Sequence, residues 1–230
     1  SLFDKTKGID KYYHFNKSKI ANTNGYRCIH VWDWDDCTKV VQLLKHREKV
    51  NARDCVVSSV PENIAKDYLN EHHLQGYVKD DIRLGLYYND EVVEIMTFGK
   101  PRYNSKYEYE LLRLCGHKYV VGGAEKLFKY FITTYNPTSI VSYCDFSKFS
   151  GDVYTALGMS LQKTDVAKHW YCIKTHQHIL DSSLNKVGFD NLFGTNYGVG
   201  QSNAELMKQN GFVEIYDAGR GRFVWNSSKL

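Results

Sequence analysis

The sequence predicts an α/β (α+β) fold, with a mixed central sheet flanked by helices and a small helix-strand-helix module ahead of it. Residues 107–114 alternate with a period of two, as a strand does. Apolar side chains then recur at helical spacing over residues 127–132, and residues 139–144 are rich in β-forming side chains. A strand, an amphipathic helix and a second strand in succession are typical of an α/β sheet.

Two glycines separate the first of these strands from the helix. They lie in the segment Val121, Gly122, Gly123 and Ala124, after the strand has ended at Gly116. Glycine lets the backbone approach a bound group, and the first N–H groups of a helix favour an anion such as a pyrophosphate. An ordinary strand-to-helix turn is the alternative interpretation, because glycine is common in such turns.

Two polar residues follow the strand at 139–144. Asp145 comes directly at its C-terminal end, and Tyr154 lies on a short helix that ends at Gly158. Ligands of open α/β sheets bind at the carboxyl ends of the strands, so we expect Asp145 and Tyr154 to face one site. The alternative is that Asp145 only caps the next helix.

This order of strand, glycine turn, helix, strand and short helix resembles the second half of the GNAT fold of N-acyltransferases. The resemblance implies that Val121, Gly122, Gly123 and Ala124 bind the pyrophosphate of acyl-coenzyme A, and that Tyr154 acts as a general acid. Tyr119 replaces the Gln or Arg that usually begins this loop pattern.

The remaining elements from Cys55 onward complete the GNAT order. Strands are predicted at 55–60, 83–88, 92–98 and 169–173, the last continuing the same sheet, and helices at 62–70 and 204–209. Asn89-Asp90 is a hairpin turn signal. Three further segments are predicted as a linker (50–54), a long loop (175–201) and a terminal hairpin (213–216 with 222–225).

The first 50 residues predict a helix at 15–24, a strand at 26–32 and a basic helix around Val40 to Leu44. From Tyr12 to about Lys49 the segment resembles the distal part of very-short-patch-repair-like and related homing endonucleases, without the upstream strands that carry the metal-binding aspartate. The resemblance implies a nuclease-like remnant or DNA-contact module, and a plain appendage is the alternative. We therefore predict domains at 1–50 and 51–230.

Four elements occur in the order found in phage Mom-type proteins, a GNAT branch that modifies adenine in DNA: His72 or His73, then Arg113, Asp145 and Tyr154. The resemblance spans Cys55 to Ile173. It implies Asp145 or a histidine as base, Tyr154 as acid and Arg113 as stabiliser of developing negative charge, which is the set that acyl transfer to an amine needs. Arg113 could instead pair structurally with Glu108 or Glu110.

A metal is a further reading of the same residues. Two histidines and a carboxylate suit a transition metal, so His72, His73 and Asp145 are candidate ligands, and the Mom-type resemblance suggests iron. Adjacent histidines point apart, however, and for a histidine beside a helix end the alternative is a capping or surface role.

Composition is that of a soluble globular protein, with 43% hydrophobic and 24% charged residues and a net charge of +4. Six scattered cysteines without a C-x-x-C pair favour reduced thiols and a cytoplasmic location. The Mom-type resemblance implies a phage protein in a bacterial host. We expect no membrane span or signal peptide. Eighteen tyrosines offer surfaces for stacking with bases, although a tyrosine-rich core is the plainer alternative.

These observations predict a phage-type GNAT-like N-acyltransferase that modifies a nucleobase in DNA, with an acyl-coenzyme A or other acyl donor. One alternative is a DNA-binding accessory part of a homing-type endonuclease without transfer chemistry. The other is an ordinary N-acetyltransferase of small molecules or proteins.

Overall fold

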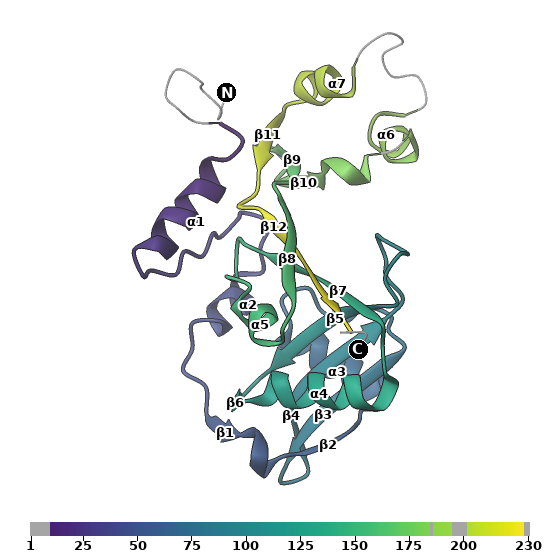
Figure 1. Cartoon of the computed structure of the whole chain (residues 1–230). Helices are drawn as coiled ribbons and strands as arrows, with labels where there is room; N and C mark the ends of the chain where they lie inside the picture. The colour runs from purple at the N-terminus through teal and green to yellow at the C-terminus, as the bar shows by residue number, and fades with distance from the viewer. Residues whose placement is uncertain (1–9, 185, 195–201, 228–230) are drawn as a thin grey trace. The chain divides into compact units, whose positions relative to one another are not determined.

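The computed structural model of the chain describes residues 10–184, 186–194 and 202–227 (Figure 1). The chain forms two compact units. Unit 1 holds residues 1–35, 144–150 and 164–221, and unit 2 holds residues 36–143, 151–163 and 222–230. These boundaries lie elsewhere than residue 50, and the predicted functional division at that residue stays a prediction.

Unit 2 contains most of a seven-stranded sheet of order β2-β3-β4-β5-β7-β12-β8. Its strands are β2 (Val56–Ser59), β3 (Ile82–Tyr88), β4 (Glu91–Gly99), β5 (Tyr109–Gly116), β7 (Ser139–Asp145), β12 (Arg220–Asn226) and β8 (Ser160–Asp165). The pairs β2–β3, β3–β4 and β4–β5 are antiparallel, and β5–β7 is parallel. The predicted mixed central sheet flanked by helices is therefore confirmed.

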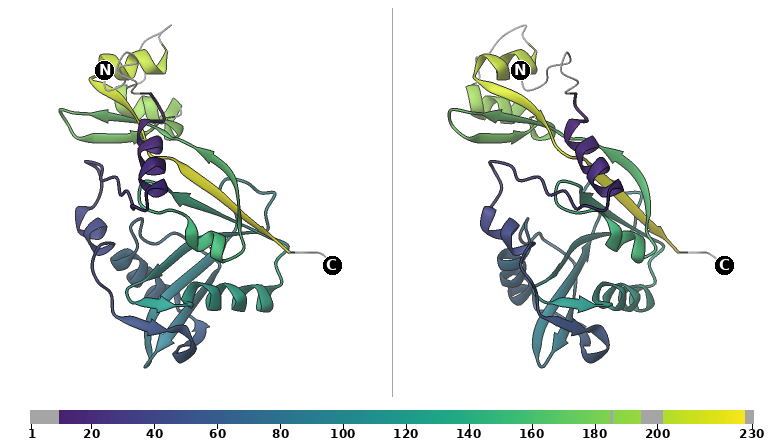
Figure 2. Two further views of the ribbon diagram at one scale, coloured as in Figure 1. Left: turned by 60° about the vertical axis from the view of Figure 1, so that its left-hand side comes forward. Right: turned by 90° about the vertical axis from the view of Figure 1, so that its left-hand side faces the viewer.

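The helices of unit 2 are α2 (Cys37–Gln42), α3 (Glu62–His72), α4 (Gly123–Tyr135) and α5 (Asp152–Ala156). Helices α3 and α4 lie on opposite faces of the sheet, as the right-hand view of Figure 2 shows. Ala65 and Leu69 of α3 are buried, as are Leu127, Phe128 and Phe131 of α4. Phe131 stacks on Phe98 of β4, so the apolar periodicity of α4 packs against the sheet as the sequence indicated.

Local signals explain the turns of unit 2. Asn89 and Asp90 have φ of 49° and 64°, the left-handed values that a tight hairpin requires and that these two residue types tolerate best. Helix α4 ends at Tyr135, and its C-cap residue Asn136 has φ of 47° and precedes Pro137. The hairpin and the helix end predicted here are confirmed.

The predicted linker at 50–54 is wrong. Strand β1 (Lys49–Asn51) pairs in parallel with β6 (Tyr119–Val121), and a 3-10 turn, η2 (Ala52–Asp54), follows it. Val50 and Ala52 are buried. The segment is too short to show periodicity, so only its burial against β6 reveals it as part of the fold.

Unit 1 contains helices α1 (Tyr13–Thr23), α6 (Lys186–Phe193) and α7 (Asn203–Gln209), and a three-stranded antiparallel sheet. Its strands are β10 (Gln177–Leu180), β9 (Lys168–Cys172) and β11 (Phe212–Tyr216), in that order. A core of six buried residues joins this sheet to α6 and α7: Trp170, Cys172, Phe189, Leu206, Met207 and Phe212.

Four predictions for unit 1 and its neighbours are wrong. The strand predicted at 169–173 is β9, at Lys168–Cys172, and it belongs to the separate three-stranded sheet. The region 175–201 contains β10, η3 (Asp181–Ser183) and α6, with residues 195–201 outside the described part. Strands β11 and β12 form no hairpin, because β11 pairs with β9 while β12 lies between β7 and β8. A period-two pattern identifies a strand but not its neighbour.

The fourth error is the strand at 26–32. This segment follows α1 and carries no strand assignment. Instead its rings stack: His30 lies on Trp32, and Trp32 on Trp34, with interplanar angles of 13° and 5°. Ring stacking and the backbone bond from the His30 N–H to the Ser147 carbonyl hold this segment, so the spacing of its rings at 30, 32 and 34 reflects a column of stacked rings.

Candidate functional site

The most distinctive feature of unit 2 is the divergence of two parallel strands. Strands β5 and β7 pair only at Tyr109 with Ile140 and at Glu110 with Val141, within the described residues. Beyond these pairs the hydroxyl of Ser142 donates to the Leu111 carbonyl at 2.9 Å, so a side chain bridges the two strands where the ladder stops. The sheet therefore opens toward the carboxyl ends of β5 and β7, the end at which α/β sheets bind ligands.

The N-terminus of α4 follows this opening. Gly122 is its N-cap residue and has φ of 74°, a left-handed value that favours glycine, and no side chain caps the first turn. With thirteen residues, α4 presents the partial positive charge of its first N–H groups here. Of the four predicted cofactor residues, Gly122, Gly123 and Ala124 form this turn, whereas Val121 belongs to the short ladder with β1.

A buried carboxyl group lies directly beneath this turn. Glu94, on β4, is 9% exposed, and its Oε2 atom forms no hydrogen bond with any described residue. An ideal Cβ on Gly123 would come within 1.8 Å of that oxygen. Burial, and then the nearby carboxylate of Glu125, raise the pKa of Glu94 to about 7. Sequence reasoning missed this residue, although a glutamate inside the apolar run VVEIM was a usable signal.

Three of the predicted catalytic residues come together in unit 2. The buried Arg113 donates from Nε to the Gly76 carbonyl and from Nη1 to the Leu112 carbonyl, at 2.8 and 2.9 Å. Burial lowers the pKa of Arg113, while Tyr154 acts to raise it, so the phenol lies within electrostatic reach. Burial, with Arg113 next, also lowers the pKa of His73 to about 3. The alternative ion pair of Arg113 with Glu108 or Glu110 is not formed, since Glu108 binds Thr138 and Glu110 pairs with Arg102.

The geometry of His73 limits its role. Its Nδ1 accepts the Gln75 backbone N–H at 3.0 Å, so the neutral ring carries its proton on Nε2. An imidazole whose pKa is about 3 is a weak base at neutral pH. His73 therefore suits hydrogen-bond donation from Nε2 better than proton abstraction.

His72 belongs to a different cluster. Its ring packs edge-on against Tyr68 and lies 5.3 Å from the ring of His117, while the Tyr68 hydroxyl contacts His117 Nδ1 at 3.0 Å. The two adjacent histidines thus point apart, as expected. Over the described residues, no group of three or more His, Cys, Asp or Glu side chains is arranged to hold a metal ion.

Asp145 lies in unit 1, at the last position of β7. Its Oδ1 accepts the Ser147 backbone N–H at 2.8 Å, and its carbonyl accepts from Lys148 and Phe149. Burial raises the pKa of Asp145, although the bonds from Ser147 oppose this. The observed bonds are those of a turn-capping aspartate.

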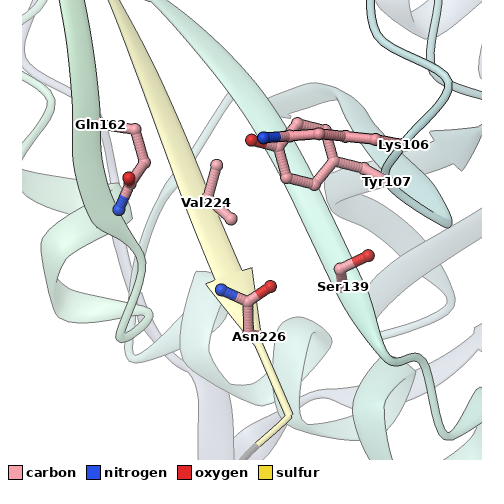
Figure 3. A pocket seen from close by; sticks show the side chains of 6 residues that line it. All are labelled: Lys106, Tyr107, Ser139, Gln162, Val224 and Asn226. Atoms are coloured by element: carbon pink, nitrogen blue, oxygen red, sulfur yellow. The ribbon is translucent and has the colours of Figure 1, made fainter.

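A polar pocket of about 310 Å³ lies on one face of the unit 2 sheet, toward the N-terminal ends of β5 and β7 (Figure 3). Its lining side chains include an amine, a hydroxyl and two amides, from Lys106, Ser139, Gln162 and Asn226. Val224 and Asn226 alternate with the buried Phe223 on β12, and Arg222, on the same face, has a buried Nε without a partner among the described residues. Sequence patterns could not show this convergence of four segments.

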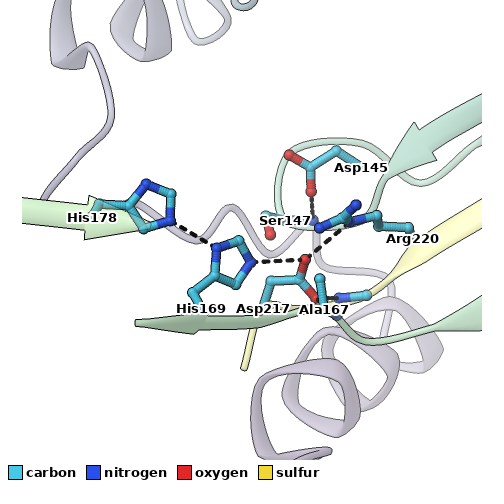
Figure 4. A network of polar contacts seen from close by, with 8 residues as sticks. Asp145, Ser147, Ala167, His169, His178, Asp217 and Arg220 are labelled. Carbon is cyan, nitrogen blue, oxygen red and sulfur yellow. Dashed lines mark hydrogen bonds and ion pairs between the residues drawn. The ribbon is translucent and has the colours of Figure 1, made fainter. Parts of the chain in front are cut away.

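Unit 1 contains a second polar network (Figure 4). His178 Nε2 lies 2.7 Å from His169 Nδ1, and His169 Nε2 lies 3.4 Å from Asp217 Oδ2, which also faces Arg220 Nε at 3.4 Å. Burial, and then His169, lower the pKa of His178 to about 4. Trp34 stacks on His178 with ring centroids 4.0 Å apart.

Asp217 also has a clear structural task in this network. Its Oδ1 accepts the backbone N–H groups of Ala167 and Gly219, each at 2.9 Å. The carboxylate thereby fixes the chain between β11 and β12. His169 and His178 connect Asp217 to Trp34, which stacks on His178.

The chain is similar to several solved acetyltransferase structures. One is a Bacillus subtilis acetyltransferase in complex with CoA, with 13% identity, 75% of this chain and 98% of that chain covered, and a TM-score of 0.40. Another is a putative acetyltransferase from Salmonella typhimurium with acetyl-CoA, with 10% identity, 77% and 96% covered, and a TM-score of 0.43. An IAA acetyltransferase from Bacillus cereus matches at 12% identity, with 75% and 99% covered and a TM-score of 0.41.

No family model matches the sequence, and no curated protein matches it either. No helix within the described residues is long and apolar enough to cross a membrane. At identities of 10 to 13%, these structures do not specify the chemistry of this chain.

Proposed function

We propose that unit 2 is an acyl-coenzyme A-dependent N-acyltransferase. The observation that carries the proposal is the opening between β5 and β7 beside the uncapped N-terminus of α4. Strands that stop pairing leave backbone groups for an extended ligand, and the first turn of α4 attracts a diphosphate. Acyl-coenzyme A has both features, and it supplies the acyl group as a thioester.

The residues near the opening suit the protein's part of this reaction. An amine attacks the thioester carbonyl, and the departing sulfur needs a proton. Tyr154 can give that proton from its hydroxyl, and the guanidinium of Arg113 lowers the energy of negative charge near it. His73, neutral and with its proton on Nε2, suits a hydrogen bond to the substrate. Asp145 stays a predicted base.

The proposed acceptor is the exocyclic amine of a nucleobase in DNA, adenine in the first place, as the Mom-type resemblance implies. The side chains around the polar pocket support it. Tyr103, three residues before the pocket residue Lys106 in the sequence, is 75% exposed, and the Arg102 guanidinium carbon lies 5.4 Å from its ring centroid. An exposed aromatic ring suits stacking with an unpaired base, and a base must leave the duplex to react.

The test is incubation of the purified chain with acetyl-coenzyme A and single-stranded or duplex DNA. Nucleoside mass spectrometry and release of free thiol are the readouts. We expect an acetylated nucleoside, lost in Tyr154→Phe while coenzyme A binding persists. Acetylation of other amines but not of DNA would leave an N-acyltransferase with another acceptor. DNA binding without coenzyme A binding or product would instead favour the accessory DNA-binding role.

A further inference from the structure

Glu94 and the first turn of α4 meet at a single glycine. Oε2 of Glu94 is enclosed, forms no hydrogen bond with any described residue, and occupies the space beside Gly123, the first residue of α4. A buried carboxylate without a partner is unfavourable, so this position favours the protonated acid. The same turn is where the proposed function places a diphosphate.

The titratable groups around Glu94 do not compensate its charge. Glu125, from α4, is a second carboxylate and raises the pKa of Glu94 further after burial. Cys115 of β5, Tyr68 of α3 and Cys55 before β2 also lie within electrostatic reach. Burial raises the pKa of each of these three, that of Cys115 to about 12, so they stay neutral at physiological pH.

The nearby cations are engaged elsewhere. Arg47 Nη1 donates to the Gly116 carbonyl at 2.8 Å. Lys126 Nζ donates to the carbonyls of Ala52 and Cys55, at 2.8 and 2.6 Å. Lys118 pairs with two other carboxylates, those of Glu48 and Glu91. None of these three cations therefore forms an ion pair with Glu94.

We propose that Glu94 is a proton-linked gate for anion binding at the first turn of α4: it is protonated when a diphosphate is bound, and its ionised form opposes that diphosphate. This inference rests on the proposed function. Two negative groups on either side of one glycine backbone repel each other. By reciprocity, binding the diphosphate draws a proton onto Glu94.

Isothermal titration calorimetry of the full chain with coenzyme A tests the gate. Titrations at about pH 7.5 in Hepes and in Tris, which differ in ionisation enthalpy, give the number of protons taken up. We expect the wild type to take up about 0.7 proton more than Glu94→Gln, and its Kd to rise up to about tenfold per pH unit above pH 7. Glu91→Gln, the same change on the exposed end of β4, should match the wild type.

The outcomes separate the two proposals. Equal proton uptake by the wild type and Glu94→Gln, with coenzyme A bound by both, overturns the gate alone. Absence of coenzyme A binding at pH 6 in all variants overturns the proposed function, and the gate with it. If Glu94→Gln does not fold, ¹³C NMR of glutamate carboxyls in the wild type decides. One resonance titrating near pH 7 must then shift upward in pKa on saturation with coenzyme A.

Discussion

The carboxyl group of Glu94 fills the space that a side chain on Gly123 would need. An ideal Cβ at Gly123 comes within 1.8 Å of Glu94 Oε2 and 2.9 Å of Val120 Cβ. Its neighbour Gly122 differs, because φ there is 74° and the nearest atom to an added Cβ is 3.8 Å away. Contact therefore requires glycine at 123, and backbone conformation favours it at 122.

Gly123→Ala should destabilise the protein by about 1–3 kcal/mol through overpacking. The cost should shrink when Glu94 is first truncated by Glu94→Ala, which frees most of the space. Urea denaturation of the four proteins of this cycle measures the coupling. Gly122→Ala is the control, with a strain cost of roughly 1–2 kcal/mol that Glu94→Ala leaves unchanged. Equal costs of Gly123→Ala in both backgrounds would refute the contact.

The raised pKa of Glu94 makes stability depend on pH. Its pKa is about 7 in the folded protein and near the ordinary 4.5 when unfolded. Between these values the folded state binds more protons, so stability falls as pH rises from about 4.5 to about 7. Glu94→Gln should remove a penalty on the order of 3 kcal/mol at pH 8 but little at pH 4.5.

Chemical denaturation at a series of pH values, with Glu91→Gln as the control, checks this dependence. Glu91 is exposed and paired with His117 and Lys118, so its substitution should not reproduce the rise. Parallel stability curves for the wild type and Glu94→Gln would show that Glu94 ionises normally.

The ion pair of Arg102 and Glu110 is the best-satisfied buried charge of unit 2. Glu110 is 1% exposed and accepts from the backbone N–H, Nε and Nη2 of Arg102, at 2.8, 3.0 and 2.6 Å. Arg102→Ala leaves that carboxylate buried without its partner and should lower the free energy of unfolding by about 3–5 kcal/mol. Adding Glu110→Gln should recover part of this loss in thermal unfolding. A double variant no more stable than Arg102→Ala would contradict this account.

Tyr154→Phe separates chemistry from binding. The ring stacks on Phe223 with centroids 4.9 Å apart, and the substitution keeps that contact. Loss of the general acid should lower the turnover rate by about 10²–10⁴ with little change in coenzyme A affinity. Stopped-flow measurement of thiol release and calorimetry give the two values. An unchanged rate would remove Tyr154 from the mechanism.

Arg113→Lys probes the second member of the same cluster. A lysine cannot reproduce the two bonds from the guanidinium to the carbonyls of Gly76 and Leu112. We expect turnover to fall and stability to drop by about 1–3 kcal/mol, since a buried carbonyl loses its donor. Unchanged stability and turnover in the same two assays would count against both roles.

The sequence by itself determined the longer strands and helices of unit 2 from β2 to α5 and their order, but not the strands β1, β6 and β8. Their signals lie within one segment: the period of β5, the apolar stripe of α4, the left-handed Asn89-Asp90 turn and the stop before Pro137. Sterics and side-chain spacing over a few residues suffice to specify such features. The positive φ of Gly122 is a local feature of the same kind, whereas the roles of Arg113 and Tyr154 come from family resemblance and stay predictions.

Only the tertiary structure decided which distant segments meet. Strand β12 joins β7 and β8 rather than β11, the rings of His30 and Trp32 stack instead of pairing in a ladder, and Glu94 lies under Gly123. Strand periodicity specifies the face of a side chain, not its partner across the sheet. The pKa of Glu94 likewise depends on desolvation by segments far away in the chain, which no local pattern encodes.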